Sequence, residues 1–418
     1  MMALNKFKIS YFVQGSVMGR FTKSIGNGGL ISKGFLATVF TVSSMGSGDL
    51  MAEGAFMEAM KDGEVKFDFR YRIENVDDDV SGKKEANAST LKSRFTYTTG
   101  KWRDFQAQIE VDDLSEIGND SFNSTKNGKI DYSVVKDPQG TEVNQAWIAY
   151  TGLSDSTIKH GRTRVLLDNQ RFIGGVGWRQ NEQTYDVTAL INTSIKDTTV
   201  FLAHVRDIQG IAGDAVSTSS NLYNVNYKGI KSSQLTVYFY DLDNISKTKG
   251  IRLAGKPEVG GVAVHYELEL ASQQEEGVAS SFDADYSHVV VGLTAATITA
   301  KVGRETQESD GGMVAFRTPL GTNHGFNGWA DKFLTTPADG LEDTYFLAST
   351  EISDFNIKAV YHDFEAEHGS RDYGDELDIS ISKKVSKNVT VLGKYADYDG
   401  DGGKDSTRKL WMQIQAKF

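Results

Sequence analysis

The stretch that decides the fold is Glu64–Val76, EVKFDFRYRIENV. Its alternate residues form an apolar set, Val65, Phe67, Phe69, Tyr71 and Ile73, and a charged set, Glu64, Lys66, Asp68, Arg70, Arg72 and Glu74. Because successive side chains point to opposite faces of a β-strand, this segment would have one apolar face and one charged face. A helix cannot sort these residues in that way. The stretch therefore predicts an amphipathic strand.

The same alternation recurs along the chain. We find it at residues 64–76, 88–99, 103–112, 141–151, 156–165, 181–192, 197–206, 220–229, 233–241, 247–255, 260–272, 279–291, 295–306, 342–351, 354–364, 374–384, 388–398 and 406–418. These segments cover over half of residues 53–418, whereas an ordinary soluble domain has about 20 to 25% of its residues in strands. Strand content this high is expected of a closed barrel.

The lengths of the connections alternate as well. Connections after even-numbered segments are short, and those after odd-numbered segments are mostly long, reaching 113–140 and 307–341. This alternation is typical of an outer-membrane barrel with short periplasmic turns and long extracellular loops. We therefore predict an all-β fold, a transmembrane antiparallel up-and-down β-barrel of 18 strands, with 16 strands as the second choice, in the outer membrane of a Gram-negative bacterium.

Composition excludes several other classes. The 418 residues include 4 Pro, 42 Gly and no Cys, with a formal net charge of −11. Without Cys there is neither a disulfide framework nor a thiolate metal site, and the acidic balance argues against nucleic acid as a partner. No apolar run is long enough for a transmembrane helix. All four prolines, Pro138, Pro257, Pro319 and Pro337, fall in predicted loops or turns, as a sheet without edges requires.

The N-terminal residues have a different character. Residues 1–52 carry five basic residues and one acid, and their apolar stretch Gly34–Val42 is followed by small residues up to Ala52. This layout predicts a signal peptide over 1–52, removed before the barrel domain 53–418. A disordered basic tail is the alternative.

The inward faces of the segments are charged or amidic, which predicts a wet interior. Eighteen strands enclose more space than their side chains can fill. Together these properties predict a channel.

Two motifs carry a resemblance to a known family. They are FRTPLGTNHGFNGWADKFLTTPADGLEDTY at Phe316–Tyr345 and GRTRVLLDNQRFIGGVGWRQNEQTYD at Gly161–Asp186. The chain resembles the alginate-export-like, OprD-like group of Gram-negative outer-membrane porins. The resemblance implies an 18-stranded, monomeric-type barrel with basic side chains in the lumen and long loops that narrow or cover the pore. A polysaccharide exporter is only one member of the family, so its substrate does not transfer.

Alternation predicts which charges line the lumen. The predicted basic residues are Lys66, Arg70, Arg72, Lys92, Arg94, Lys409 and Lys417. The predicted acidic residues are Glu267, Glu269, Asp283, Asp285, Glu376 and Asp378. A basic wall opposite an acidic wall creates a transverse field that could orient small carboxylates or zwitterions. Pairing among these charges to stiffen the barrel is an equally open interpretation.

Two loop segments are candidates for the rim or the constriction. Their candidate residues are Arg162, Arg164, Arg171, Arg179, Phe326, Trp329 and Lys332. The loop 307–341 is too long for a simple connection. Folded inward it would be a constriction, and folded outward a lid. A purely structural role for these residues is an equally open alternative.

One weak metal signal is present. Asp397, Asp399 and Asp401 followed by Gly402 match the first half of a calcium loop, but Arg408 stands where the closing glutamate belongs. A solvated acidic turn is the default interpretation, and no other cofactor is predicted. The sequence contains neither a nucleophile motif nor a phosphate-binding motif, so we predict that the protein is not an enzyme.

The sequence thus favours an outer-membrane channel for passive diffusion of small hydrophilic solutes, with a preference for carboxylate-bearing or zwitterionic ones. The alternatives are an exporter of an anionic polysaccharide and a closed barrel that serves as an adhesin or structural anchor. The predicted partners are outer-membrane lipid and lipopolysaccharide, and the barrel-assembly machinery through the C-terminal Phe418. The oligomeric state stays open, with a homotrimer as one option.

Overall fold

A computed structural model describes residues 49–274 and 282–418. In these residues, eighteen long strands form one antiparallel sheet. The strands are β1 (Glu64–Asp78), β2 (Ala86–Thr98), β3 (Phe105–Ser121), β4 (Gly140–Tyr150), β5 (Ser156–Thr163), β6 (Thr184–Asn192), β7 (Thr198–Gln209), β8 (Ala215–Tyr227), β9 (Ser233–Leu242), β10 (Ser246–Gly255), β12 (Val262–Gln274), β13 (Asp283–Ala295), β14 (Ile298–Gln307), β17 (Leu341–Ile352), β18 (Phe355–Glu365), β19 (Asp372–Lys384), β20 (Val389–Gly400) and β21 (Thr407–Lys417). The short elements are α2 (Asp49–Lys61), β11 (Glu258–Val259), β15 (Ser309–Asp310), β16 (Val314–Ala315) and the 3-10 turn η1 (Asn323–Gly325).

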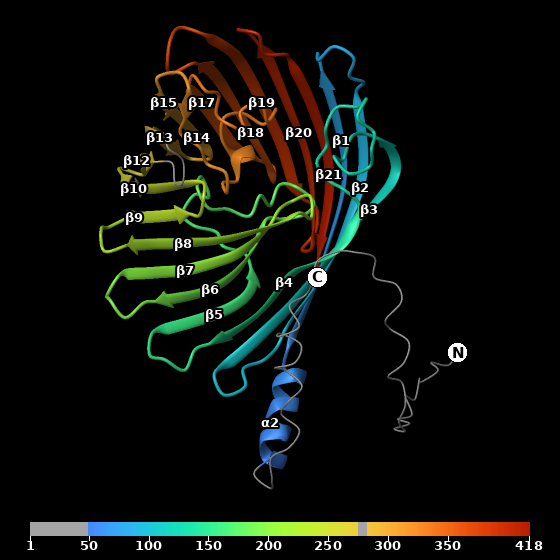
Figure 1. Cartoon of the computed structure of the whole chain (residues 1–418), viewed down its shortest axis with the longest axis vertical. Coiled ribbons are helices and arrows are strands. Elements are labelled where there is room, and N and C mark those ends of the chain that lie inside the picture. The colour runs from blue at the N-terminus through green and yellow to red at the C-terminus, as the bar shows by residue number, and fades with distance from the viewer. Residues whose placement is uncertain (1–48, 275–281) are drawn as a thin grey trace. The chain divides into compact units, whose positions relative to one another are not determined.

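The sheet closes on itself between its first and last strands (Figure 1). β1 pairs antiparallel with β21 over eleven residue pairs, from Asp68 with Lys417 to Asp78 with Thr407. The backbones of Phe67 and Phe418 extend the seam with reciprocal hydrogen bonds of 3.0 and 2.9 Å. Closure leaves no strand edge whose N–H and C=O groups lack a partner, which is what crossing a bilayer requires. The predicted 18-stranded barrel is confirmed.

The two ends of the barrel differ in their connections. At the end where β1 begins and β21 ends, which we call the turn end, neighbouring strands are joined by short turns. The turn between β17 and β18 has only two residues, Ser353 and Asp354, with φ of 49° and 67°. Positive φ at both positions is the geometry that matches the twist of a tight hairpin. The opposite end, which we call the loop end, carries the long connections.

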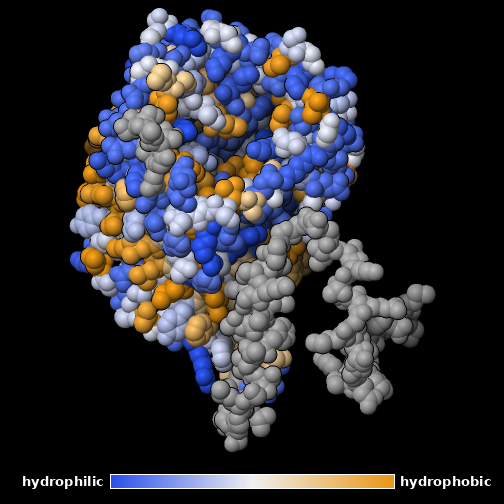
Figure 2. All heavy atoms as spheres, in the orientation of Figure 1, coloured by the Kyte–Doolittle hydropathy of each residue, from blue (hydrophilic) through white to orange (hydrophobic). Residues whose placement is uncertain are grey.

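The outer surface of the barrel is apolar. Phe67, Phe69 and Ile73 of β1 are exposed, and so are Leu410, Met412 and Ile414 of β21 beside it. Figure 2 shows apolar side chains gathered on the flank of the barrel and hydrophilic ones around the loops. Among the described residues, no helix has the length and apolarity needed to span a membrane.

The interior is only partly polar, so the prediction of a wet lumen throughout was wrong. On the inner faces of β6, β9 and β13, Tyr185, Tyr240 and Tyr286 are buried. They belong to one hydrophobic cluster with Phe172 and Phe316, which come from two loops. The ring centroids of Phe172 and Tyr286 are 5.3 Å apart. The alternation did not identify these inward tyrosines, whose rings pack against apolar side chains of loops that fold inward.

The predicted signal peptide lies almost wholly outside the described residues. Its last four residues begin α2, which runs past Ala52 to Lys61. Later residues of α2 contact the turn end: Gly100 N–H donates to the carbonyl of Ala59 at 2.8 Å, and the Phe56 and Trp102 rings lie 5.6 Å apart. Removal of residues 1–52 stays a prediction.

Candidate functional site

Two long connections of the loop end fold into the lumen (Figure 1). We call residues 164–183, between β5 and β6, loop A, and residues 308–340, between β14 and β17, loop B. They are joined by hydrogen bonds from Gly174 N–H to Leu320 O and from Thr322 N–H to Gln170 O, both 2.9 Å. Of the two placements open for loop B, the structure has the inward one, because its Trp329 and Ala330 N–H groups donate to buried carboxylates of β19.

The junction of the two loops needs a glycine. A Cβ at Gly321 would lie 2.2 Å from the carbonyl oxygen of Arg171. Only a residue without a side chain lets the two backbones approach this closely. Gly321 therefore allows loop B to lie this close to loop A.

Arg171 of loop A ties both loops to the wall. Its side chain is 1% exposed and forms an ion pair with Glu305 of β14. The guanidinium also donates to the side-chain oxygens of Gln307 and Asn327, both at 2.7 Å. Burial of this charge is offset by charge-assisted hydrogen bonds to several acceptors. The predicted rim residue Phe326 lies against it, with the guanidinium 4.9 Å from the ring centroid.

The predicted basic residues of β1, β2 and β21 form one continuous patch. Arg70 stands opposite Lys92 on one side and Gln415 on the other. Loop A covers Arg70 and Arg72 of this patch. Arg70 donates to the Gln180 side chain at 2.8 Å and to the carbonyl of Gly177 at 3.1 Å.

The other cations of this patch are differently placed. Arg72 stacks on the Trp178 ring at 4.1 Å, and Lys92 is buried at 1% exposure. Lys66 and Lys417 are exposed at the turn end, where they pair with Glu64 at 2.8 Å and Asp68 at 3.8 Å.

Arg94 lies in a second ion-pair network beneath loop A. It donates to both carboxylate oxygens of Asp112, at 2.7 and 2.6 Å, and to Glu182 of loop A at 2.9 Å. Arg164 pairs with Glu182 and with Glu110. Burial alone would raise the pKa of Glu182, but Arg94 and Arg164 hold it well below its ordinary value. The Glu182 carboxylate, an anion held between two guanidinium groups, therefore anchors loop A to the wall.

Four of the six predicted acidic residues face the interior. Glu267 and Glu269 of β12 lie near Arg252, which donates to Glu267 at 2.8 Å and lies 3.6 Å from Glu269. On β19, Asp378 accepts from Trp329 N–H at 3.1 Å and Glu376 from Ala330 N–H at 2.7 Å. The acids of β19 therefore receive the backbone of loop B.

The other two acids, Asp283 and Asp285, were placed wrongly. Both are exposed, on the face of β13 that also carries Val289 and Val291. The inward face carries Ala284, Tyr286, His288 and Val290, all of them buried. The apolar run Val289–Val291 fits either face, so alternation alone could not assign the inward side of this strand.

The remaining rim candidates lie in different places. Arg179 is buried and pairs with Glu74 at 3.0 Å, and Lys332 donates to Thr407 at 2.9 Å. Arg162 lies where β5 reaches the loop end, but on the outer face that carries the exposed Ile158, and it pairs there with Asp186 at 2.8 Å. Arg179 therefore holds loop A to the wall, and Lys332 holds loop B to it.

A lysine that the sequence did not single out lies at the centre of the loop B contacts. The Lys394 ammonium of β20 is 3.7 Å from the Trp329 ring centroid and 4.1 Å from that of Trp178. It is 2.7 Å from Nε2 of His324, whose Nδ1 is 2.6 Å from Asp331. Alternation within β20 could have placed Lys394 on the inward face, but no sequence pattern identifies its indole neighbours.

His324 of loop B is buried, and the side chain of Asp331 beside it is 12% exposed. Burial lowers the pKa of His324 to about 3, and the nearby Lys394 adds to this while Asp331 opposes it. Burial would raise the pKa of Asp331, but His324 and Lys409 hold it well below its ordinary value. Lys409, a predicted basic lumen residue, pairs with Asp331 at 2.8 Å. The loop is thus docked with a neutral imidazole and a charged carboxylate.

The segment that matches half of a calcium loop lies mostly in a strand, so the solvated acidic turn expected by default holds only for Asp401. Asp397 and Asp399 lie in strand β20, on its exposed face, and only Asp401 is in a turn. Asp397 accepts from Tyr395 at 2.9 Å and Asp399 from Ser406 at 3.1 Å. A strand directs these carboxylates outward instead of around one point. The described part of the chain contains no cluster of three or more His, Asp or Glu that could hold a metal ion.

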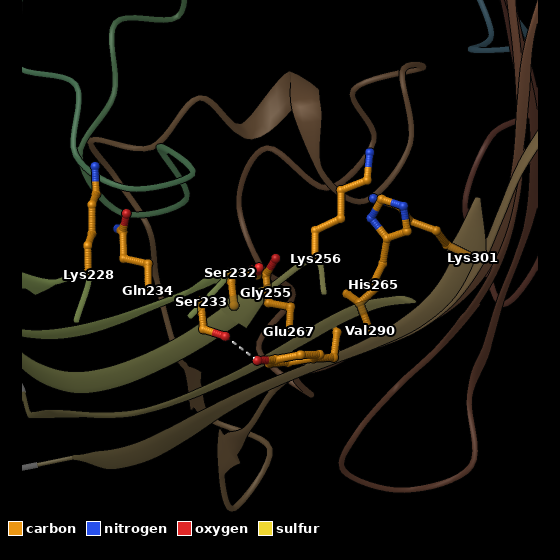
Figure 3. A pocket seen from close by; sticks show the side chains of 12 residues that line it. Lys228, Ser232, Ser233, Gln234, Gly255, Lys256, His265, Glu267, Val290 and Lys301 are labelled. Atoms are coloured by element: carbon orange, nitrogen blue, oxygen red, sulfur yellow. Dashed lines mark hydrogen bonds between the residues drawn. The ribbon is translucent and has the colours of Figure 1, made fainter. Parts of the chain in front are cut away.

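A pocket of about 530 Å³ lies toward the turn end, and its lining residue Glu267 accepts a hydrogen bond from Asn169 of loop A at 3.1 Å. It is lined by Lys228, Ser232, Ser233, Gln234, Ala254, Gly255, Lys256, His265, Tyr266, Glu267, Val290 and Lys301. Figure 3 shows three lysines among these side chains, with Glu267 between them. Except for Glu267, no sequence pattern singles out these residues, because several of them lie in short turns.

Comparisons with known proteins agree with this architecture. The family model described as Alginate export matches residues 63–289, more than half of the chain. A comparison with curated protein sequences finds no match.

Many solved structures are similar. Acinetobacter baumannii OccAB2 has a TM-score of 0.70 at 13% identity, over 86% of this chain and 98% of its own. Pseudomonas aeruginosa OccK9 (OpdG) has a TM-score of 0.69 at 16% identity, over 86% and 100%. Pseudomonas aeruginosa OpdK, solved with vanillate, has a TM-score of 0.65 at 12% identity, over 86% and 99%. At these identities the likeness shows a shared fold.

Proposed function

The chain belongs to the Alginate export family, and on that premise we propose that it is an outer-membrane channel through which small hydrophilic solutes diffuse passively, with a preference for carboxylates. The turn end would face the periplasm and the loop end the exterior. No covalent chemistry is needed for this function, and we propose none.

The observation that carries the proposal is the contrast along the lumen. Loops A and B narrow the part of the lumen near the loop end, where arginines and acidic side chains are paired and buried. Below them the inward positions stay polar and partly exposed, for example Asp68, Gln415 and Lys358. Focused charge in a narrow, poorly screened passage selects among ions and orients polar solutes. A polar path past a fixed constriction is the construction expected of a diffusion channel.

The carboxylate preference has two supports. In the part of the chain that the structure describes, basic side chains without partners line the pocket at the turn end. In addition, the similarly folded OpdK was solved with vanillate, a carboxylate. Arginine and lysine are the side chains that recognise carboxylates.

The two alternatives predict different behaviour. Export of an anionic polysaccharide would need a wide lumen that is basic throughout, and Glu267, Glu269 and the aromatic cluster around Phe172 count against it. A barrel acting as an adhesin or anchor would not conduct. A homotrimer and recognition of Phe418 by the assembly machinery remain proposals from the sequence.

Uptake into proteoliposomes tests the function. Vesicles that contain the purified protein are assayed with benzoate and with a neutral sugar of similar size. We expect both solutes to enter faster than into empty vesicles, and benzoate to enter faster than the sugar. Uptake equal to that of empty vesicles would overturn the channel, and faster entry of the sugar would overturn the carboxylate preference.

A further inference from the structure

The pocket at the turn end brings together three lysines from three separate parts of the chain. Lys228 follows β8, Lys256 follows β10, and Lys301 lies within β14. All three line the same pocket of about 530 Å³. In Figure 3, Lys256 and Lys301 lie beside His265, whereas Lys228 lies beside Gln234 on the other side. The pocket is within the size range of small-molecule sites, about 300 to 1,000 Å³.

These lysines differ from Arg70, Arg72 and Arg94 in having no partner among the described residues. Within residues 49–274 and 282–418, none of the three ammonium groups has a hydrogen bond, an ion pair or an aromatic ring against it. The one lining carboxylate, Glu267, is already engaged by Arg252 at 2.8 Å and by the side-chain amide of Asn169 at 3.1 Å. The pocket therefore has uncompensated positive charge that a bound anion would neutralise.

The placement of the charges favours a ligand with two separated anionic groups. Lys228 and Lys256 follow strands that are two positions apart in the sheet, since β9 pairs with both β8 and β10. Two strand spacings amount to roughly 10 Å. A ligand with one carboxylate at each end would span the cations, whereas a single carboxylate could reach only one side.

The groups between the cations define the middle of the ligand. The Glu267 carboxylate accepts hydrogen bonds and would repel further negative charge. The hydroxyls of Ser233 and Tyr266 are hydrogen-bonded to each other, but Tyr266 precedes Glu267 in β12 and so lies on the opposite face of the sheet. Hydroxyl groups on the ligand could donate to Glu267, which an aliphatic chain could not do.

We propose that this pocket is a binding site for a small dicarboxylate with a hydroxylated middle, such as a six-carbon sugar diacid. The inference deepens the proposed function, because a solute leaving the constriction would be held here before its release at the turn end. Lys228 would bind one carboxylate, and Lys256 and Lys301 the other.

Calorimetry on the full chain in detergent, at low ionic strength so that the charges are not screened, tests the site without requiring conduction. The probes are glucarate with two carboxylates and hydroxyls, adipate with two carboxylates and no hydroxyls, and gluconate with one carboxylate. We expect glucarate to bind most tightly and gluconate about tenfold more weakly, because one charge contact is lost.

Substitutions localise the binding. Lys256→Gln and Lys301→Gln should each weaken glucarate binding about fivefold, whereas Lys231→Gln, in the same turn as Lys228 but outside the pocket, should leave it unchanged. Equal affinities for glucarate and gluconate, or unchanged binding by both pocket variants, would overturn the site. Binding as expected by a protein that takes up no solute would overturn the channel and leave the site standing.

Discussion

The cations of this barrel fall into two regions that use their charge differently. Beneath loop A, Arg70, Arg72 and Arg94 are buried, and each guanidinium is occupied by loop or wall groups. At the turn end, Lys228, Lys256 and Lys301 line an open pocket without partners. The difference teaches that a basic lumen residue is not by its position alone a solute ligand. Where a loop covers it, its charge holds the loop.

The residue types fit this division. Arginine presents a planar fork that binds several acceptors in fixed geometry, as Arg94 does with Asp112. Lysine is a flexible point charge that can follow a moving anion. The constriction is thus built mainly from arginine, and the pocket from lysine.

The largest effect should come from breaking the tie between the two loops. Arg171→Ala leaves Glu305 buried and unpaired, and loss of one partner of a buried pair costs about 3 to 5 kcal/mol. We expect loops A and B to undock, with faster hydrogen exchange in both and a larger single-channel conductance.

Arg304→Ala is the matched control. Arg304 also lies in β14 and pairs with a glutamate, Glu342, but its side chain is 57% exposed. Its loss should change stability by at most about 1 kcal/mol and leave both readouts unchanged. Equal effects of the two substitutions would show that the buried pair does not hold the loops.

A smaller effect is expected from the approach of loop B to β19. A Cβ at Gly328 would lie 2.2 Å from a carboxylate oxygen of Glu376, and its φ is +82°. Gly328→Ala should therefore displace the 329–330 backbone from the acids of β19, at about 1 to 2 kcal/mol for the left-handed conformation alone. Protease sensitivity of loop B is the measurement.

Gly325→Ala is the comparison for this test, since no atom lies within 4 Å of the added carbon. It should leave the cleavage rate as in the unsubstituted chain. If both variants were cleaved at the same rate, the close approach at Gly328 would not be what positions loop B.

The last effect is a dependence on pH. Because the pKa of His324 is about 3 when the loop is docked and 6.5 ordinarily, the undocked loop binds a proton between these values and the docked loop does not. Docking of loop B should weaken as the pH falls below about 6.5, by up to about 1.4 kcal/mol per pH unit. Asp331 also weakens docking as the pH falls, but only below its ordinary pKa of 3.8.

The frequency of brief conductance changes at pH 7 and pH 5 measures this effect. We expect it to rise at pH 5 in the unsubstituted chain and to stay constant with His324→Gln. A rise of the same size in the variant would assign the pH dependence to another group.

The barrel could be predicted from sequence because hydrophobic alternation is a local property. In each strand, as in Glu64–Val76, the alternate residues themselves show which face is apolar and which is polar. Closure of the sheet then follows from the number of strands and from backbone hydrogen bonding. The interior could not be predicted in the same way. Whether Arg70 faces water or Gln180 depends on a residue more than a hundred positions away.

Individual misassignments have the same origin. Because Val289–Val291 is uniformly apolar, the sequence does not show which face of β13 points inward. Asp283 and Asp285 were therefore assigned to the lumen, although they lie on the outer face. The Asp397–Asp401 spacing resembled a loop, but its residues belong largely to a strand. The pocket lysines, two of which lie in short turns, carry no motif and become a group only after the strands around them are paired.

The reversal potential of single channels in a planar bilayer, with a tenfold KCl gradient, tests the central claim most directly. We predict an open channel with an anion-selective reversal potential, which moves toward zero when Lys228, Lys256 and Lys301 are replaced by Gln. A barrel that does not conduct, or a cation-selective potential that these substitutions leave unchanged, would contradict it.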